Sequence, residues 1–281
     1  MSAQDWQENC LSYIGRTRQH TDVLTVNATN CLLATLNDST TLNAGDKLPP
    51  LFHWIYFNEP VLAENLKYDG HEKLGDFLPP VPYPKRMWAG SEVRFLNDLQ
   101  LGLETVKNST IKSVKFKTGS SGALCFVDVE HAYSQAGKDC LIDVHTIVYK
   151  EETATSITEK PVEPQGEDER YDQSVGAVTL FRYSALTFNA HLIHYDEAYA
   201  REEGYPGLVV HGPLIATLLM RNALAEEPNK TPVHFRFRGL APVFADNRFT
   251  IHNDAKEDGL TLQLTKQGDI AAMKAEVEWQ Q

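Results

Sequence analysis

The sequence predicts an α+β protein made of two similar halves, and three observations indicate this class. The chain has 281 residues, about twice the length of a usual compact domain. Each half contains an apolar helix-like segment followed by runs in which apolar and polar residues alternate, the period of half-buried strands. A weak repeat relates the halves, because residues 93–102 can be laid over residues 235–244. We therefore expect a helix-then-sheet unit to occur twice.

In the N-terminal half, residues 1–150, the helix candidate is short and rests on Leu32, Leu33 and Leu36. Apolar residues then alternate with polar ones between residues 101 and 148, and glycines lie where turns are expected. This pattern indicates an antiparallel meander.

Between the halves, residues 151–173 differ in composition from the rest of the chain. This segment contains many acidic residues, the prolines Pro161 and Pro164, and almost no large apolar side chain. Such a composition predicts an exposed acidic linker.

The C-terminal half, residues 174–281, has the clearer helix. It begins near Gly212, with Pro213 at the first turn, where a missing N–H costs nothing, and it is apolar nearly all round. The alternating apolar positions that follow are Phe249, Ile251, Leu260, Leu262, Leu264, Met273, Ala275, Val277 and Trp279. We expect each sheet to curl around its helix, and the two sheets to join edge to edge so that fewer edge strands are exposed.

Charge and hydropathy exclude several classes of function. Lys and Arg total 26 against 38 Asp and Glu, so a net charge of −12 disfavours nucleic-acid binding. A polyanionic ligand would need a local cationic pocket. The longest apolar stretch, residues 207–220, is interrupted by His211 and Pro213, so we expect no membrane span.

The N-terminus and the cysteines indicate the compartment. The first residues have neither a secretory nor a mitochondrial targeting pattern. Cys10, Cys31, Cys125 and Cys140 are far apart and contain no Cys-x-x-Cys motif, so we expect reduced thiols. These features predict a cytoplasmic protein.

The residues that could carry chemistry are concentrated before the C-terminal helix. Asn189, His191, His194 and Asp196 fall within eight positions, from residue 189 to residue 196. The N-terminus of the helix at Gly212 directs free N–H groups and the positive end of its dipole toward this segment. Such an arrangement suits an oxyanion, and a glycine lets a substrate approach the backbone.

Two motifs in this region resemble a known family. The segment Tyr183–Asp196, which reads YSALTFNAHLIHYD, and the segment Gly207–Leu214, which reads GLVVHGPL, resemble the MaoC-like, type 2 enoyl-CoA hydratase family. The segments Gly45–Phe57 and Phe77–Gly90 are similar to the N-terminal half of its double-hot-dog branch. That branch includes mesaconyl-C4-CoA hydratase, itaconyl-CoA hydratase and type 2 hydroxyacyl-thioester dehydratases. The resemblance implies two hot-dog folds, the N-terminal one a non-catalytic partner.

The resemblance also implies roles for individual residues. The catalytic histidine of the family corresponds to His194, its oxyanion-hole glycine to Gly212, and its catalytic aspartate to Asn189. The last position departs from the family, because an amide cannot accept a proton at neutral pH. Three explanations stay open. Asn189 positions the water while His194 is the sole base, or Asp196 or a carboxylate of the N-terminal half replaces the aspartate, or a dicarboxylic substrate supplies its own carboxylate.

Further residues could line the thioester and nucleotide pocket. These candidate substrate-binding residues are Arg86, Trp88, Arg182, Tyr195, Tyr205, His211, Arg236 and Arg238. Arg236 and Arg238 alternate with apolar residues on one strand face, which would also fit a solvated sheet face. His191, His194, Asp196 and His211 have side chains that bind Zn²⁺, but the resembling family needs no metal, and we expect none.

The resemblance implies a hydro-lyase for coenzyme A or acyl-carrier thioesters, with coenzyme A as part of the substrate and no separate cofactor. We expect short branched dicarboxylic substrates, mesaconyl-C4-CoA or itaconyl-CoA, which hydration converts to citramalyl-CoA. The alternatives are a 3-hydroxyacyl-thioester dehydratase of fatty-acid metabolism and a catalytically silent acyl-thioester binding protein. Because two hot dogs already form a pair, a monomer and a homodimer are both open.

Overall fold

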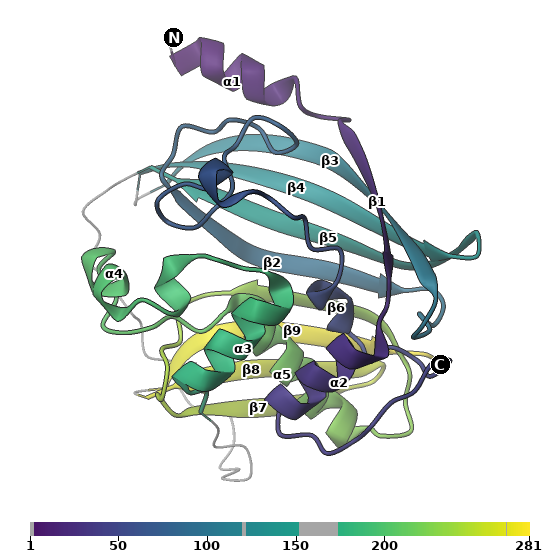
Figure 1. Ribbon diagram of the computed structural model, residues 1–281. Coiled ribbons are helices and arrows are strands. Elements are labelled where there is room, and N and C mark those ends of the chain that lie inside the picture. The colour runs from purple at the N-terminus through teal and green to yellow at the C-terminus, as the bar shows by residue number, and fades with distance from the viewer. Residues whose placement is uncertain (1–2, 120–121, 152–173, 268) are drawn as a thin grey trace.

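The computed structural model describes residues 3–119, 122–151, 174–267 and 269–281 (Figure 1). The described strands form one antiparallel nine-stranded sheet in the order β1-β3-β4-β5-β2-β6-β9-β8-β7. The strands are β1 Thr17–Val23, β2 Lys85–Phe95, β3 Glu104–Gly119, β4 Gly122–Gln135, β5 Lys138–Lys150, β6 Pro232–Gly239, β7 Phe249–Lys256, β8 Gly259–Lys266 and β9 Ile270–Trp279. The helices are α1 Ala3–Leu11, α2 Val26–Thr35, α3 Ala177–Thr187, α4 Glu197–Glu202 and α5 Gly212–Glu226, with short 3-10 turns η1 Phe52–Ile55, η2 Ala63–Asn65 and η4 Leu192–His194.

The two halves meet at the pairing of β2 with β6, so the predicted edge-to-edge junction is confirmed. In this ladder Val93 lies opposite Phe235, the two residues that the repeat equates. An antiparallel pair of equivalent residues is what a pseudo-two-fold axis between them produces. Around this axis β2, β5, β4 and β3 correspond to β6, β9, β8 and β7, and β1 is an additional edge strand.

The C-terminal half has the predicted helix and sheet. α5 begins at Gly212 and packs on β7, β8 and β9. Its buried residues include Leu214, Leu219 and Met220, all fully inaccessible to solvent. The alternating apolar residues predicted on β7, β8 and β9 are buried in the same core. Because α5 and the strands β7, β8 and β9 both bury apolar residues where they meet, the N-terminus of α5 is held in a fixed position.

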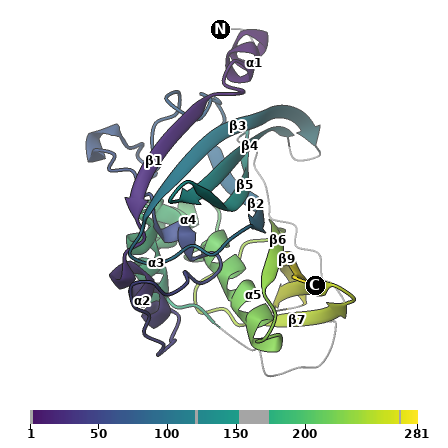
Figure 2. The same cartoon turned by 90° about the vertical axis from the view of Figure 1, so that its right-hand side faces the viewer.

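The N-terminal half differs from the prediction in two respects. Its helix, α2, makes its main contacts with α3 and η1, so it is not enclosed by its own sheet as α5 is. Both views show α2 beside α3 (Figures 1 and 2). In addition, Leu101 and Leu103 precede β3 in a turn, because their backbone groups bond to the loops around Asp46 and Leu24.

A second apolar cluster lies at the other end of the N-terminal sheet. It joins Cys10 and Tyr13, at the end of α1 and beyond it, to Val81 and to Ile111 and Val127 on β3 and β4. The face of the N-terminal sheet is therefore covered at both ends by apolar clusters, with a different environment between them.

Several smaller expectations concern the rest of the chain. All four cysteines are free thiols, as predicted. The acidic linker predicted over residues 151–173 lies outside the described residues, apart from Glu151. Among the described helices, none combines the length and the apolar character that crossing a membrane requires.

Candidate active site

The segment predicted to be catalytic begins where α3 ends. Phe188 has a φ of +52°, the left-handed conformation that often terminates a helix. The Asn189 N–H donates to the Ser184 carbonyl oxygen at 2.9 Å, and the Asn189 Oδ1 accepts from the His191 N–H at 3.0 Å. This turn engages the oxygen of the Asn189 amide. In the described part of the chain no residue accepts a hydrogen bond from its Nδ2 group, which can therefore donate to a ligand.

His194 lies in η4, directly after this turn, and its side chain is buried. Its Nδ1 is 2.7 Å from the Val209 carbonyl oxygen. Because a carbonyl only accepts, the Nδ1 carries the hydrogen and the Nε2 keeps its lone pair. Burial lowers the pKa of His194 to about 4, so the ring is neutral at pH 7. The arrangement provides an imidazole base in a fixed tautomer.

His211 and Gly212 form the start of α5. The His211 ring stacks on the His194 ring with centroids 3.7 Å apart, and its Nε2 lies 2.8 Å from the Ser184 Oγ. His211 therefore holds the orientation of His194. Gly212 is the first residue of α5, and none of the described residues accepts a hydrogen bond from its N–H. This N–H and the helix dipole are available to a negatively charged oxygen.

These residues line one large cleft between the halves, with a volume of about 2430 Å³. His194, Asn189 and Gly212 all line it, so the structure brings the three predicted catalytic residues together. The opposite wall belongs to β2. A Cβ on Gly212 would lie 3.8 Å from the Trp88 carbonyl oxygen, an ordinary contact distance, so β2 comes close to the start of α5.

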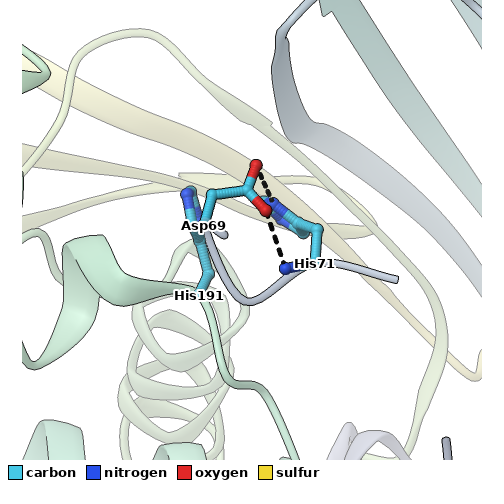
Figure 3. Close-up of side chains that lie close together, drawn as sticks. All are labelled: Asp69, His71 and His191. Atoms are coloured by element: carbon cyan, nitrogen blue, oxygen red, sulfur yellow. Dashed lines mark hydrogen bonds and ion pairs between the residues drawn. The ribbon is translucent and has the colours of Figure 1, made fainter. Parts of the chain in front are cut away.

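The N-terminal half contributes a carboxylate and a histidine to the same place. Asp69 Oδ2 lies 3.3 Å from His71 Nδ1, and Asp69 Oδ1 accepts from the His71 N–H at 2.9 Å (Figure 3). The His71 ring lies beside the His191 ring, with centroids 4.0 Å apart. Burial raises the pKa of Asp69, but its hydrogen bonds with His71 and the charges of His71 and Lys67 outweigh this and lower it. Asp69 is therefore ionised.

Backbone contacts fix this pair relative to the catalytic segment. The Leu192 N–H donates to the Asp69 carbonyl oxygen at 3.0 Å. A Cβ on Gly70, whose φ is +88°, would lie 1.8 Å from the Ala190 carbonyl oxygen, so only glycine fits there. The loop of the N-terminal half thus lies directly against the segment that carries His194.

Asp69, His71 and His191 also have the donor atoms of a cation site, and these atoms lie within 4.8 Å of one another. The Lys67 Nζ, however, is 3.2 Å from Asp69 Oδ2 and already supplies a positive charge. We assign no metal to this cluster. The possible zinc ligands considered from the sequence, namely His191, His194, Asp196 and His211, do not come together as a metal site in the described part of the chain. Asp196 is instead the N-cap of α4 and accepts from the Tyr199 N–H at 3.0 Å. Asp196 does not line the cleft, which argues against it as a replacement base.

A second polar cluster lies on the N-terminal sheet, between its two apolar clusters. Asp143 is fully buried and accepts hydrogen bonds from His145 at 2.7 Å, Trp54 at 2.7 Å, His53 at 3.1 Å and Ser91. Burial raises the pKa of Asp143, but the facing His145 and these hydrogen bonds lower it well below its usual range. The cluster keeps a negative charge beneath the floor of the cleft.

The remaining predicted residues occupy different places. Those that line the cleft are Arg86, Trp88, Tyr195, Tyr205, His211, Arg236 and Arg238. Arg182 is not in the cleft, because it lies on the solvent-exposed side of α3. Arg236 binds Glu276 at 3.0 Å, whereas Arg238 is exposed and forms no ion pair with any residue that the structure describes. The two arginines thus share a strand face but not an environment.

Sequence reasoning missed Asp69 and His71 as individual residues. It left open a carboxylate from the N-terminal half, and Asp69 is the carboxylate of that half beside the motif. No local pattern identifies it, because about 120 residues separate it from Asn189 (189 minus 69). The only local signal is the glycine between Asp69 and His71, which marks a tight backbone approach.

Comparisons with known proteins agree with this geometry. Residues 51–245 match the family model described as hydroxyacyl-thioester dehydratase type 2. The chain is 40% identical to the mesaconyl-C4-CoA hydratase of Chloroflexus aurantiacus over 99% of each chain. It is 27% identical to the mitochondrial hydroxyacyl-thioester dehydratase type 2 of Schizosaccharomyces pombe, over 73% of this chain and 77% of that one.

Solved structures show the same fold. A MaoC-like dehydratase superimposes with a TM-score of 0.68 at 14% identity, covering 96% of this chain and 99% of that one. A protein of Mycobacterium tuberculosis with a double hot-dog fold superimposes with a TM-score of 0.59 at 12% identity, covering 95% and 96% of the two chains. The predicted double hot-dog, α+β architecture is thereby confirmed.

Proposed function

Because this chain belongs to the hydroxyacyl-thioester dehydratase type 2 family, we propose that it is a hydro-lyase that reversibly hydrates an α,β-unsaturated acyl-CoA thioester. The preferred substrates are short, branched and dicarboxylic, namely mesaconyl-C4-CoA or itaconyl-CoA, with citramalyl-CoA as product. The full-length similarity to a mesaconyl-C4-CoA hydratase supports this choice. The reaction needs no cofactor beyond the coenzyme A that the substrate carries.

One observation carries the proposal. The unprotonated Nε2 of His194 and the N–H of Gly212 both face a cleft that holds no competing partner for either group among the described residues. A base next to an oxyanion donor is the pair that addition of water to an enoyl thioester requires. With the thioester oxygen at the Gly212 N–H, the double bond extends into the same cleft as His194.

The proposed step follows from these positions. His194 Nε2 takes one proton from a water molecule while the water oxygen bonds to the β-carbon. The electron pair of the double bond moves toward the thioester oxygen and forms an enolate, whose charge the Gly212 N–H and the dipole of α5 stabilise. The His194 imidazolium then gives its proton to the α-carbon, and the neutral ring is restored. Asn189 contributes its Nδ2 donor to hold the water.

The reverse reaction defines a second candidate function. Dehydration of a fatty 3-hydroxyacyl thioester uses the same groups in the opposite order, and the family description and the Schizosaccharomyces pombe relative favour it. The polar residues His53, His131 and His145, which line the cleft, disfavour a long aliphatic chain, because such a chain would leave them beside hydrocarbon.

A substrate panel tests the proposal. The wild-type protein is incubated with mesaconyl-C4-CoA, itaconyl-CoA and crotonyl-CoA, and the loss of the enoyl-thioester absorbance is followed. We expect kcat/KM for a dicarboxylic thioester to exceed that for crotonyl-CoA by at least about tenfold. The variant His194→Gln should lower kcat by about 10²-fold or more. His252→Gln, on β7 outside the cleft, is the matched control.

The outcomes separate the three functions. Preference for crotonyl-CoA would favour the fatty-acid dehydratase, and binding of all three thioesters without turnover would favour the silent binding protein. A folded His194→Gln variant with a normal rate would contradict the assignment of the base.

We further propose a cytoplasmic location. The free state of all four cysteines supports it, since such thiols persist in a reducing compartment.

A further inference from the structure

The N-terminal half places a second histidine with a fixed tautomer beside the catalytic segment. His71 lies in the loop that contacts residues 190–192, and its Nδ1 faces the Asp69 carboxylate at 3.3 Å. Because an ionised carboxylate only accepts, the Nδ1 carries the hydrogen and the Nε2 of His71 keeps its lone pair. His71 therefore presents the same kind of acceptor as His194.

His71 also lies within electrostatic reach of His194. Its charge, when present, would lower the pKa of His194, and its ring lies beside His191, whose ring is in turn 5.7 Å from that of His194. Both His71 and His194 line the cleft together with Asn189. The groups that face His71 are Asp69, Lys67, Arg86, His191 and His194.

A water molecule that attacks a β-carbon needs partners of a defined kind. It has two hydrogens to donate and two lone pairs, one of which forms the new bond. His194 Nε2 can accept one hydrogen and the Nδ2 of Asn189 can donate to the second lone pair. One acceptor is missing from this set, and the Asn189 oxygen already accepts from the His191 N–H within the turn.

We propose that His71 is that acceptor and is a second catalytic histidine of the hydration reaction, contributed by the N-terminal half and oriented by Asp69. Its Nε2 binds the hydrogen of the water that His194 does not remove. In the addition step His194 takes one proton, the water oxygen bonds to the β-carbon, and the other hydrogen stays on oxygen as the hydroxyl of the product, still bound to His71. Asp69 is a positioning residue, because it acts through His71. This inference rests on the proposed function.

Two replacements of His71 separate a hydrogen-bond acceptor from a space-filling side chain. His71→Leu removes the acceptor and keeps much of the volume, whereas His71→Gln keeps an oxygen acceptor. We expect kcat for the best thioester of the panel to fall by about 10²-fold in His71→Leu and by less than about tenfold in His71→Gln, with KM within threefold in both. His252→Leu, outside the cleft, should keep kcat within twofold.

Asp69→Asn completes a double-mutant cycle. Alone it should lower kcat by about tenfold, because His71 is then free to turn or change tautomer. In the His71→Leu background it should lower kcat no further, since a residue that acts only through His71 has nothing left to orient. Thermal unfolding of each variant shows that the fold is intact.

Several results would overturn the inference. They are a His71→Leu variant within threefold of the wild-type kcat, equal losses in His71→Leu and His71→Gln, and additive losses in the cycle. Inactivation by a chelator that Zn²⁺ reverses would also overturn it, because the His71 lone pair would then bind a metal. If the wild type and all variants fail to hydrate every thioester, the proposed function fails as well. If only His194→Gln is inactive, the proposed function stands and the role of His71 is refuted.

Discussion

The two halves share a strand order but differ in what faces the concave side of the sheet. From the central pair Val93 and Phe235, the next strand carries Asp143 in the N-terminal half and Val277 in the C-terminal half. Val277 is buried in the main core on the sheet that packs on α5, and Asp143 accepts the hydrogen bonds of a polar cluster. Equivalent positions thus have opposite chemistry.

The difference continues one strand further. Asp143 is paired with His131 on β4, and Val277 is paired with Leu260 on β8. Where the C-terminal sheet is covered by its helix, the N-terminal sheet borders the cleft, because α2 packs on α3 instead. One half fills this space with its helix, and the other leaves it as the cleft. A duplicated fold can therefore build a site from two copies without two active centres.

The largest expected effect compares the equivalent residues Leu260 and His131. Leu260→Ala should lower the free energy of unfolding by about 3 kcal/mol, because it removes a buried side chain and leaves a cavity in the core under α5. His131→Leu should change it by less than about 1 kcal/mol, since an apolar side chain of similar size replaces a histidine whose hydrogen-bond partner, Ser109, is on the adjacent strand. Urea denaturation of both variants measures the two values. Equal losses of unfolding free energy would mean that the polar residue His131 contributes as much to stability as the apolar residue Leu260 at the equivalent position.

The apolar half of this comparison could be predicted from the sequence. Leu260, Leu262 and Leu264 alternate with polar residues, and Gly212 with Pro213 marks the start of a helix, so local periodicity was sufficient. The same periodicity was misleading at Leu101, which lies in a turn because its N–H bonds to the Asp46 carbonyl oxygen. Alternation does not reveal which partner a backbone group will find.

The site could be predicted only where its residues are adjacent in the sequence. His194 and Gly212 belong to one segment and were identified together. Asp69 and His71 join them only through the contact of Gly70 with Ala190, which depends on how the halves pack. Arg182 was included among the arginines that could form a cationic pocket, yet α3 directs it to solvent. Proximity in the sequence is therefore a poor guide to a site formed between two domains.

His194, in the catalytic motif of the C-terminal half, should make the free energy of unfolding depend on pH. The pKa of His194 is about 4 in the folded protein, below its unfolded value of about 6.5. The unfolded chain therefore binds a proton first as the pH falls, and the stability that the neutral ring contributes above pH 6.5 is lost toward pH 4. Between pH 7 and pH 5 this single group should lower the free energy of unfolding by about 2 kcal/mol.

The matched variant is His194→Gln, which cannot titrate. Its free energy of unfolding should fall less steeply between pH 7 and pH 5 than that of the wild type, by about 2 kcal/mol in total. Denaturant unfolding at a series of pH values measures both slopes. Parallel curves would show that His194 has an ordinary pKa, and its burial beside His211 would not then determine its protonation.

The smallest expected effect is at the junction of the halves, where β6 carries two arginines on one face. Arg236 is held by the Glu276 carboxylate, so its charge is largely satisfied within the protein. Arg238 lies at the rim of the cleft with no ion-pair partner among the described residues. For a chain with a net charge of −12, such a cation is well placed to bind the phosphates of coenzyme A.

We expect Arg238→Ala to raise KM for the thioester by about fivefold at low salt and less at high salt, while Arg236→Ala changes KM by less than about twofold. Equal effects of the two substitutions would mean that the whole face binds the nucleotide, and the comparison would then extend the binding surface from the N-terminal half across the junction.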